Sequence, residues 1–216
     1  MVAVIFDMDG VLIDSNPTHV AVWVEYLTNL NLPYEGIDTW MSGKRNDQIM
    51  RILLGPDAPE DVIFAHGAAK EALYRERMRP QLEQCLMPGL RDFLASLHGL
   101  PIGLGTNAEP ANVDFLLNEA NLRPHFRAIV DGHQVANPKP SPDIYLKVAQ
   151  NLGVDPKDCV IFEDSPGGIR AALAAGARVI GVERSGRQLE GPEFTIRDFN
   201  DPALANLQPP AAQKRL

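Results

Sequence analysis

The 216-residue chain contains only two cysteines, Cys85 and Cys159. Two thiols in a chain of this length do not form a disulfide framework. Cys85 has no neighbouring histidine, second cysteine or CxxC pair that would indicate a metal or redox site. Cys159 opens the apolar run 159–162, so we expect it to be a buried free thiol.

Clustered positive charge is also missing. Lysine and arginine number 20 against 28 acidic residues, which gives a formal net charge of −8. Adjacent basic residues occur only as pairs, such as Lys214-Arg215. Because nucleic-acid binding relies on clustered cations, we expect no nucleic-acid partner. A polybasic membrane-surface site is equally unsupported, so we expect no membrane partner.

Long apolar runs are absent as well. No run approaches the roughly 20 residues that a membrane-spanning helix needs. The first residues, 1–7, lack the charged region, the long apolar stretch and the cleavage site of a signal peptide. We therefore expect a cytoplasmic protein, and we favour a monomer.

What the chain does have is the composition of an ordinary globular protein. Hydrophobic residues make up 45% and charged residues 22%, so there is enough apolar material for a core. Domains usually contain about 100–200 residues, so this length predicts one domain with an insertion, or two small domains.

Short apolar runs alternate with helical stretches along most of the chain. Such runs, rich in β-branched residues, are typical of strands buried on both faces of a parallel sheet. The alternation predicts an α/β fold with a doubly wound, Rossmann-like parallel sheet, in which ligands bind at the carboxyl ends of the strands. The expected strands are 2–6, 102–104, 128–130, 159–162 and 179–182, and the expected helices are 90–97, 111–122, 143–152 and 165–175.

The segment 14–86 interrupts this alternation with helical patterns alone. We expect helices beginning at Asn16-Pro17, spanning 46–54, and opening at a capping box from Asp57 to Glu60. The predicted organisation is an α/β core formed by 1–13 and 87–207, an inserted all-α cap formed by 14–86, and a disordered tail from 208 to 216.

Two carboxylates follow the first expected strand. Asp7 and Asp9 stand two residues apart and can project to the same side, with Gly10 permitting a sharp turn. Like charges this close repel, so the pair needs a shared proton or a cation. A hard divalent cation such as Mg²⁺ satisfies carboxylate ligands. The alternative is that both are ordinary loop residues that cap a turn.

Polar residues also follow three other expected strands. The hydroxyl and backbone N–H groups of Thr106-Asn107 suit phosphate oxygens, although the pair is also common in turns. Lys139 lies between two prolines that would stiffen its loop, or it is simply a surface lysine. Glu163-Asp164 forms a second acidic pair, and the alternative is that Asp164 or Ser165 caps the next helix. Carboxylates, one cation and one hydroxyl are therefore expected on the same rim of the sheet.

In this combination the sequence resembles the haloacid dehalogenase superfamily of phosphohydrolases, in its β-phosphoglucomutase-like branch with a helical cap. The stretches that carry the resemblance are 7–15 (DMDGVLIDS), 106–107 (TN), 139–143 (KPSPD) and 163–169 (EDSPGGI). Their order and spacing cover the chain from about residue 2 to 182.

The resemblance implies a role for each core residue. Asp7 would attack phosphorus and form an aspartyl phosphate, and Asp9 would be the acid and base. Asp7, the backbone carbonyl of Asp9 and Asp164 would hold Mg²⁺, with Glu163 ligating the ion or orienting its water. The residues that would hold the transferring phosphoryl group are Thr106, Asn107 and Lys139.

The helical insertion would decide the substrate. In the mutase branch a histidine of the first cap helix helps to control the acid/base, and His19 matches it; otherwise His19 is a surface residue. Lys70 is either a substrate contact or a solvated lysine. The loop at Lys44, Arg45 and Asn46 departs from the mutases, because an ungapped match puts Asn46 where they have a phosphate-binding arginine, although Arg45 or Lys44 could substitute for it. Trp23 is expected in the cap core, and the candidate substrate contacts are His19, Arg45, Asn46 and Lys70.

Two functions remain open on this basis. One is a phosphatase for a small phosphorylated metabolite such as a sugar phosphate, and the other is a hexose-phosphate mutase with the same nucleophile. A dehalogenase needs no Mg²⁺ and usually lacks the second aspartate, so Asp9 argues against it. A phosphonate-cleaving relative would have Ala-Gly after the first aspartate, where this chain has Met8-Asp9. A non-catalytic binding module would be expected to have lost core residues that are all present here.

Overall fold

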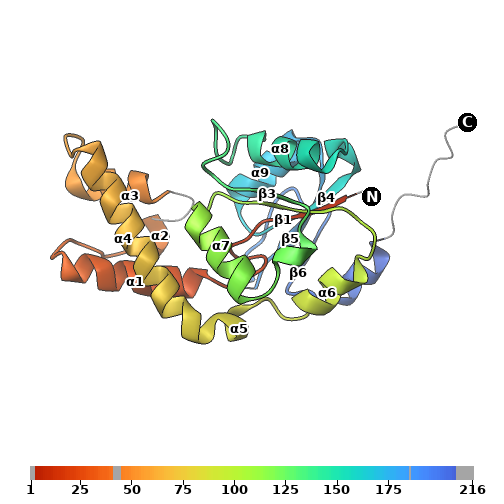
Figure 1. Ribbon diagram of the computed structural model, residues 1–216, viewed down its shortest axis with the longest axis horizontal. Helices are drawn as coiled ribbons and strands as arrows, with labels where there is room; N and C mark the ends of the chain where they lie inside the picture. Colours follow the sequence, from red (N-terminus) through yellow and green to blue (C-terminus); the bar gives the residue numbers. More distant parts are fainter. Residues whose placement is uncertain (1–2, 41–44, 185, 208–216) are drawn as a thin grey trace, which may run out of the picture. The chain divides into compact units, whose positions relative to one another are not determined.

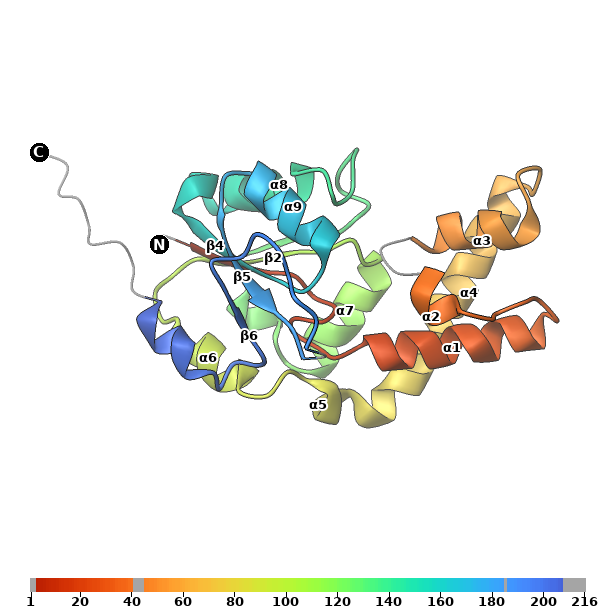
Figure 2. The same ribbon diagram turned by 180° about the vertical axis from the view of Figure 1, so that it is seen from behind.

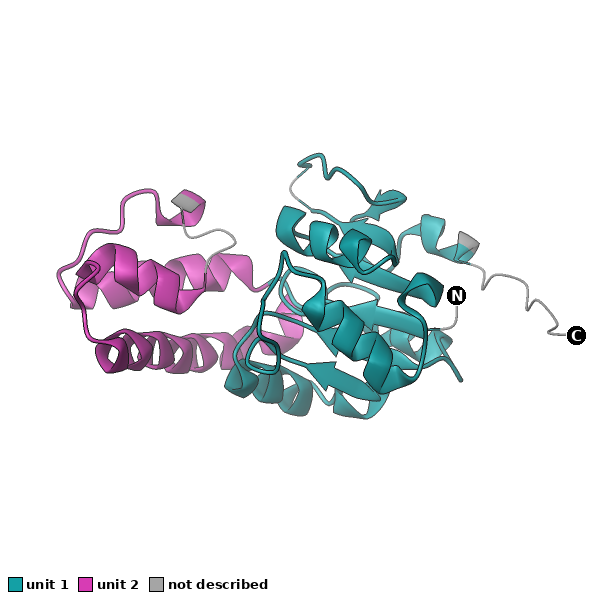
Figure 3. Ribbon diagram, turned by 90° about the horizontal axis from the view of Figure 1, so that it is seen from above, with its two compact units in different colours: residues 1–14, 86–216 teal, residues 15–85 magenta. Residues whose placement is uncertain are grey.

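The computed structural model describes residues 3–40, 45–184 and 186–207 of the chain. The chain divides into an α/β unit, Met1–Asp14 with Leu86–Leu216, and a helical unit, Ser15–Cys85, which Figure 3 colours separately. Asp14 and Leu86 belong to the α/β unit, one residue beyond each expected boundary. The tail expected at 208–216 lies outside the described residues.

The α/β unit is built on a six-stranded sheet with strand order β3-β2-β1-β4-β5-β6. Every strand pair is parallel, which confirms the predicted doubly wound class. Phe6 pairs with Leu104 on one side and with Phe162 on the other, so three strands end side by side. The strands are β1 (Ala3–Phe6), β2 (Ile102–Gly105), β3 (Ala128–Val130), β4 (Cys159–Glu163), β5 (Arg178–Val182) and β6 (Phe194–Ile196).

The edge strand β6 was not predicted. It has three residues, and Thr195 at its centre is exposed. Glu193 and Arg197 flank it, so its sequence lacks the continuous apolar run of the buried strands. Only its pairing with β5, from Ile180 to Val182, identifies it as a strand.

Helices cover both faces of the sheet. α8 and α9 lie on one face, and α6 and α7 lie on the other (Figures 1 and 2). The helices of this unit are α6 (Leu90–Ser96), α7 (Pro110–Glu119), α8 (Asp143–Leu152) and α9 (Pro166–Ala174), with short 3₁₀ turns at Arg123–His125, Pro156–Asp158 and Pro202–Asn206. None of the helices in the described part of the chain is long and apolar enough to cross a membrane.

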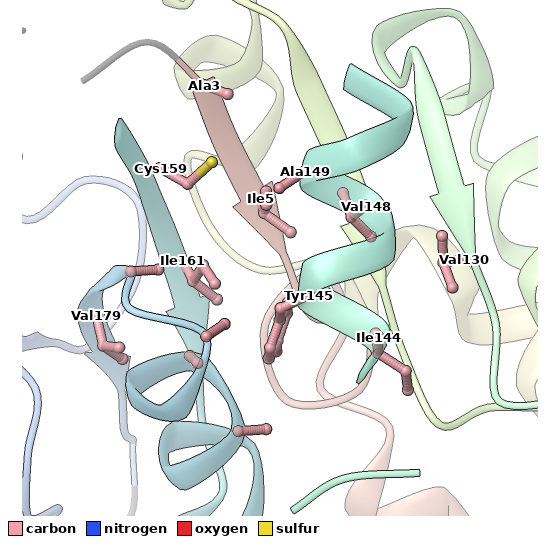
Figure 4. Packing of buried hydrophobic residues seen from close by; sticks show 14 of the residues in the cluster. Ala3, Ile5, Val130, Ile144, Tyr145, Val148, Ala149, Cys159, Ile161 and Val179 are labelled. Carbon is pink, nitrogen blue, oxygen red and sulfur yellow. The ribbon is translucent and has the colours of Figure 1, made fainter. Parts of the chain in front are cut away.

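Each face of the sheet has its own core. On the α8 and α9 face, Ile5 and Ile161 pack with Tyr145 and Val148 (Figure 4). On the other face the ring of Phe6 stacks on that of Phe162, with centroids 5.1 Å apart, and three further phenylalanines surround them: Phe93, Phe126 and Phe199. Cys159 is buried and free as predicted, and burial raises the pKa of its thiol to about 11.

In the helical unit, every regular element within the described residues is a helix. They are α1 (Asn16–Asn29), α2 (Ile37–Trp40), α3 (Asn46–Leu54), α4 (Glu60–Met78) and α5 (Leu82–Cys85), with a 3₁₀ turn at Arg79–Gln81. Trp23 belongs to the apolar core of this unit, as expected, together with Leu27, Ile49 and Ile63.

Two predicted helix starts in this unit are wrong in detail. The N-cap of α1 is Ser15 rather than Asn16. The expected capping box at Asp57 does not form, because the N-cap of α4 is Pro59. The backbone N–H of Ala58 donates to the carbonyl of Gly55, so a turn occupies the residues that the box required.

Replacement of Phe162 by alanine tests the packing under the site. Because the ring is fully buried against three others, we expect Phe162→Ala to lower the free energy of unfolding by about 3–5 kcal/mol in urea titrations. The matched control is Phe64→Ala on α4, whose ring is 58% exposed and should change the value by less than about 0.5 kcal/mol. Equal losses in the two variants would contradict this packing.

Candidate active site

The candidate site lies at the carboxyl ends of β1, β2 and β4. Because Phe6, Leu104 and Phe162 are in register, the residues that follow them meet at one edge of the sheet. The backbone N–H of Asp7 donates to the carbonyl of Phe162 at 3.0 Å, which fixes the start of the turn after β1 against β4. The sheet therefore brings together polar residues that are far apart in the sequence.

Gly10 is required by the turn after β1. Its φ is +78°, in the left-handed region that favours glycine. A Cβ atom there would lie 2.1 Å from the Oδ2 atom of Asp164. The glycine thus lets the turn close on itself and also lets the Asp164 carboxylate approach it.

Three acidic side chains gather at this edge. One carboxylate oxygen from each of Asp7, Glu163 and Asp164 lies within 4.8 Å of the others. Burial raises the pKa of Asp7 to about 7 and that of Asp164 well above its usual value, and Asp9 is close enough for its charge to raise both. Because of burial and mutual repulsion, these carboxylates ionise together only at a high cost unless a positive charge lies nearby.

This donor set fits a hard divalent cation. Such ions prefer carboxylate and carbonyl oxygens, and their charge would offset the burial and the repulsion that raise these pKa values. The Asp164 carboxylate approaches the turn after β1, where a Cβ on Gly10 would lie 2.1 Å from its Oδ2 atom. The residues present are therefore suited to the predicted metal.

Lys139 supplies positive charge within the cluster. Its Nζ donates to Oδ1 of Asp7 at 2.8 Å and to Oε1 of Glu163 at 2.6 Å, and its side chain is only 6% exposed. Burial alone would lower the pKa of Lys139, but the two carboxylates more than offset it, so the pKa is raised. The amine therefore stays protonated, and it is not the surface lysine of the alternative interpretation.

The loop that carries Lys139 is anchored at several points. The backbone N–H of Lys139 donates to Oδ1 of Asn107 at 3.1 Å. Asp143, at the start of α8, accepts from the Asn137 amide at 3.0 Å and from the Ser141 hydroxyl at 2.6 Å. These bonds hold the loop at both ends and explain how a flexible lysine is aimed inward.

Thr106 and Asn107 follow β2 directly. Thr106 is 1% exposed, its backbone N–H donates to Val130, and its hydroxyl oxygen accepts from the N–H of Ala108 at 3.1 Å. The amide oxygen of Asn107 accepts a hydrogen bond from the backbone N–H of Lys139. Both residues therefore lie at the expected rim, and Asn107 also positions the lysine.

Glu163 is the most enclosed acid, with an exposed fraction of 0%. Its carboxylate accepts four hydrogen bonds, from Lys139, the Tyr145 hydroxyl, and both the N–H and the hydroxyl of Ser165. A Cβ on Gly168 would lie 1.7 Å from Oε1, so only glycine fits there in the first turn of α9. Because a carboxylate has about four lone-pair sites, this geometry favours orienting over direct metal ligation.

The candidate residues of the helical unit form a second polar cluster. Nζ of Lys70 lies 2.7 Å from Nδ1 of His19 and 2.9 Å from Oε1 of Glu71. The Asn46 amide donates to the same Glu71 oxygen at 2.6 Å, and the His19 ring stacks on Tyr74. Lys70 is 1% exposed, so its interpretation as a solvated lysine is wrong.

The structure also shows where the remaining candidates of this unit lie. Arg45 pairs with Asp47 at 3.1 Å, and its side chain is 43% exposed. Lys44 lies outside the described residues. His19 is partly buried within the polar cluster, so it is not a simple surface residue.

Sequence reasoning missed three residues that shape these clusters, namely Tyr145, Ser165 and Glu71. Ser165 precedes a helix and was visible as a cap, and its hydroxyl does accept from the N–H of Gly168. In the sequence, Tyr145 has the spacing of an ordinary apolar position of α8. Glu71 has the context of an acid on the surface of a helix. Burial opposes ionisation of Glu71, but Lys70 and His19 more than offset it and hold its pKa at about 2.

Comparisons with known proteins were made on the whole chain. The profile of the haloacid dehalogenase-like hydrolases matches residues 1–176. The chain is 36% identical over 188 residues to fructose-1-phosphate phosphatase YqaB of Escherichia coli (strain K12), covering 82% of this chain and 94% of that protein. It is 29% identical over 224 residues to β-phosphoglucomutase of Bacillus subtilis (strain 168), covering 100% and 98%.

A solved structure is similar throughout. It is a haloacid dehalogenase hydrolase of family IA, variant 3, from Entamoeba histolytica HM-1:IMSS. The TM-score is 0.82 at 29% identity, and the match covers 93% of this chain and 94% of the other. The similarity thus extends over both the α/β and the helical parts of the sequence.

Metal binding should depend on pH because Asp7 must lose its proton to act as a ligand. With a pKa of about 7 in the metal-free protein, Asp7 is largely protonated at pH 6 and ionised at pH 8. We expect the apparent affinity for Mg²⁺ to be about tenfold lower at pH 6 than at pH 8, measured by calorimetric titration.

Asp7→Asn provides the control for this measurement: its side chain does not titrate, so the pH dependence should weaken, and what remains should come from Asp164, whose pKa is also raised. An affinity that stays constant between the two pH values in the unmodified protein would contradict the assignment of Asp7 to the metal site.

Proposed function

Because the chain belongs to the haloacid dehalogenase-like hydrolase family, we propose that it is a Mg²⁺-dependent phosphatase that acts on a small phosphorylated metabolite, such as a sugar phosphate, through an aspartyl-phosphate intermediate. Its similarity to a phosphatase and to a mutase indicates that it is an enzyme that acts on phosphomonoesters. The observation that carries the proposal is the ammonium of Lys139, held 2.8 Å from the Asp7 carboxylate inside a cluster of buried acids.

Asp7 is the proposed nucleophile. A carboxylate cannot easily approach a phosphate dianion until positive charge offsets the repulsion, and Lys139 provides part of that charge. An oxygen of Asp7 attacks phosphorus, the bond to the ester oxygen breaks, and the aspartyl phosphate forms. Thr106 and Asn107, at the end of the neighbouring strand, would hold the oxygens of the phosphoryl group that is transferred.

Asp9 is the proposed acid and base. It lies two residues from the nucleophile, close enough to raise the pKa of Asp7. It would protonate the leaving ester oxygen in the first step. It would then take a proton from the water that attacks the aspartyl phosphate, which releases phosphate and restores Asp7.

The metal would be held by Asp7, the backbone carbonyl of Asp9 and Asp164, with Glu163 orienting the set. When bound, Mg²⁺ supplies the positive charge that offsets these carboxylates and the phosphate. Glu163 would act mainly through Lys139, since its four hydrogen bonds already fix its carboxylate.

Hydrolysis is favoured over phosphoryl transfer between sugar hydroxyls by the helical unit. Asn46 stands where mutases have a phosphate-binding arginine, and it donates to the carboxylate of Glu71. The cation of Lys70 is likewise paired with Glu71. The polar cluster thus offers little surplus positive charge for a second phosphate, while His19, Asn46 and Lys70 suit sugar hydroxyls. The 36% identity to a fructose-1-phosphate phosphatase supports the same choice.

Loss of the nucleophile tests the reaction. We expect Asp7→Asn to reduce Mg²⁺-dependent phosphate release from phosphorylated sugars by more than about a thousandfold, because an amide cannot form the aspartyl phosphate. The matched control is Asp92→Asn on the exposed surface of α6, which should retain normal turnover. Circular dichroism would show that both variants keep the fold. Turnover by Asp7→Asn at the normal rate would refute the mechanism.

The fate of the phosphoryl group distinguishes the two candidate reactions. A panel of sugar and polyol monophosphates should yield inorganic phosphate in amounts equal to the substrate consumed. Glucose phosphate followed by phosphorus NMR should show hydrolysis without a 1-to-6 isomer. Isomerisation without phosphate release would establish the mutase instead.

A further inference from the structure

Tyr145 is a buried residue of α8 to which the mechanism above gives no role. Its exposed fraction is 0%, and its side chain lies between α8 and the sheet (Figure 4). The ring packs on the backbone of Gly105, where an added Cβ would approach two ring carbons to 3.2 Å. Gly105 directly precedes Thr106, so the tyrosine lies beneath the rim that carries the site.

The hydroxyl of Tyr145 reaches the centre of the charge cluster. It donates to Oε1 of Glu163 at 2.7 Å. The same oxygen accepts from Nζ of Lys139 at 2.6 Å. Nζ also lies 4.7 Å from the centroid of the Tyr145 ring, so the ring faces the ammonium while the hydroxyl shares its acceptor.

This sharing matters because Lys139 is divided between two carboxylates. Its Nζ bonds Glu163 at 2.6 Å and Asp7 at 2.8 Å. A donor on Oε1 of Glu163 reduces the negative charge that this oxygen offers to the lysine. Burial and the Glu163 carboxylate raise the pKa of Tyr145 well above its usual value, so the phenol keeps its proton and always donates.

We propose that Tyr145 is a positioning residue that sets how the charge of Lys139 is shared between Glu163 and Asp7. Without its hydroxyl, Oε1 of Glu163 would attract the ammonium more strongly. Less positive charge would then remain at the Asp7 side, where the phosphoryl group transfers. The inference rests on the proposed phosphatase reaction, and it concerns the turnover step rather than substrate binding.

Deletion of the hydroxyl tests this role. Phenylalanine keeps the ring and its packing on Gly105, so a purely structural role predicts no change in turnover. We expect Tyr145→Phe to lower kcat for Mg²⁺-dependent hydrolysis of p-nitrophenyl phosphate by about tenfold, with KM changed by less than about twofold. The melting temperature should stay within a few degrees of the unmodified protein.

A matched control removes a hydroxyl elsewhere. Tyr26, in α1, bonds Nδ1 of His66 at 2.8 Å within the helical unit. Tyr26→Phe deletes the same atom from a partly buried tyrosine, and its kcat should remain within about twofold of the unmodified enzyme. An equal loss of kcat in both phenylalanine variants would overturn the specific role of Tyr145.

A double-mutant cycle shows whether Tyr145 acts through Glu163. Glu163→Gln keeps the shape of the side chain but removes the charge that competes for Lys139. In that background we expect Tyr145→Phe to change kcat by less than about twofold, since the shared acceptor is no longer a carboxylate. If the two losses simply multiply, the residues act independently and the inference is wrong.

Failure of this inference can be told apart from failure of the proposed function. Normal kcat in Tyr145→Phe, together with an inactive Asp7→Asn, would overturn the role of Tyr145 alone. Normal phosphate release by Asp7→Asn would overturn the aspartyl-phosphate mechanism, and the role of Tyr145 with it.

Discussion

The site depends on the ammonium of Lys139, which lies between two buried carboxylates. Removing charges from water is costly unless they are paired and hydrogen-bonded, and here Asp7, Glu163 and Asp164 are brought within 4.8 Å of one another. Lys139 bonds two of these three acids, and a divalent cation would balance the rest. The raised pKa of Asp7 reflects its burial first, and then the negative charge of Glu163 and Asp9 beside it. Such a set of carboxylates is suited to a divalent cation.

The rest of the α/β unit keeps that lysine in place. Parallel pairing of β1 with β2 and β4 brings three strand ends together. Asn107 holds the backbone of Lys139, and Asp143 holds the loop on either side of it. Glu163 is fixed in turn by Ser165, and the space for its carboxylate exists because residue 168 is glycine. The packing of buried residues therefore fixes the positions of the charged groups at the carboxyl edge of the sheet, because each charged group is oriented by neighbours that are themselves buried.

The helical unit contains a separate set of charges with a different balance. Lys70 pairs with Glu71, and His19 and Asn46 complete the cluster through further hydrogen bonds. Because the cation of Lys70 is already paired, we propose that this cluster suits hydroxyl groups better than a second phosphate. We therefore propose that the α/β unit carries the chemistry and the helical unit selects the substrate; the similar proteins include both a phosphatase and a mutase.

The sequence by itself determined five of the six strands and the class of fold, and it indicated which polar residues follow those strands at the carboxyl edge of the sheet. Apolar runs such as 159–162 are governed by local pattern, and the acids that follow them must lie at the carboxyl edge of a parallel sheet. It did not predict β6, whose identity depends on its neighbour β5. Only the tertiary structure decided the burial of Lys70, the pairing of Asn46 with Glu71 and the contact of Tyr145 with Glu163. These contacts join side chains on different elements, and Lys139 and Asp7 are 132 residues apart. The periodicity of a sequence does not specify a contact between residues so far apart along the chain, because such contacts depend on how the elements pack in space.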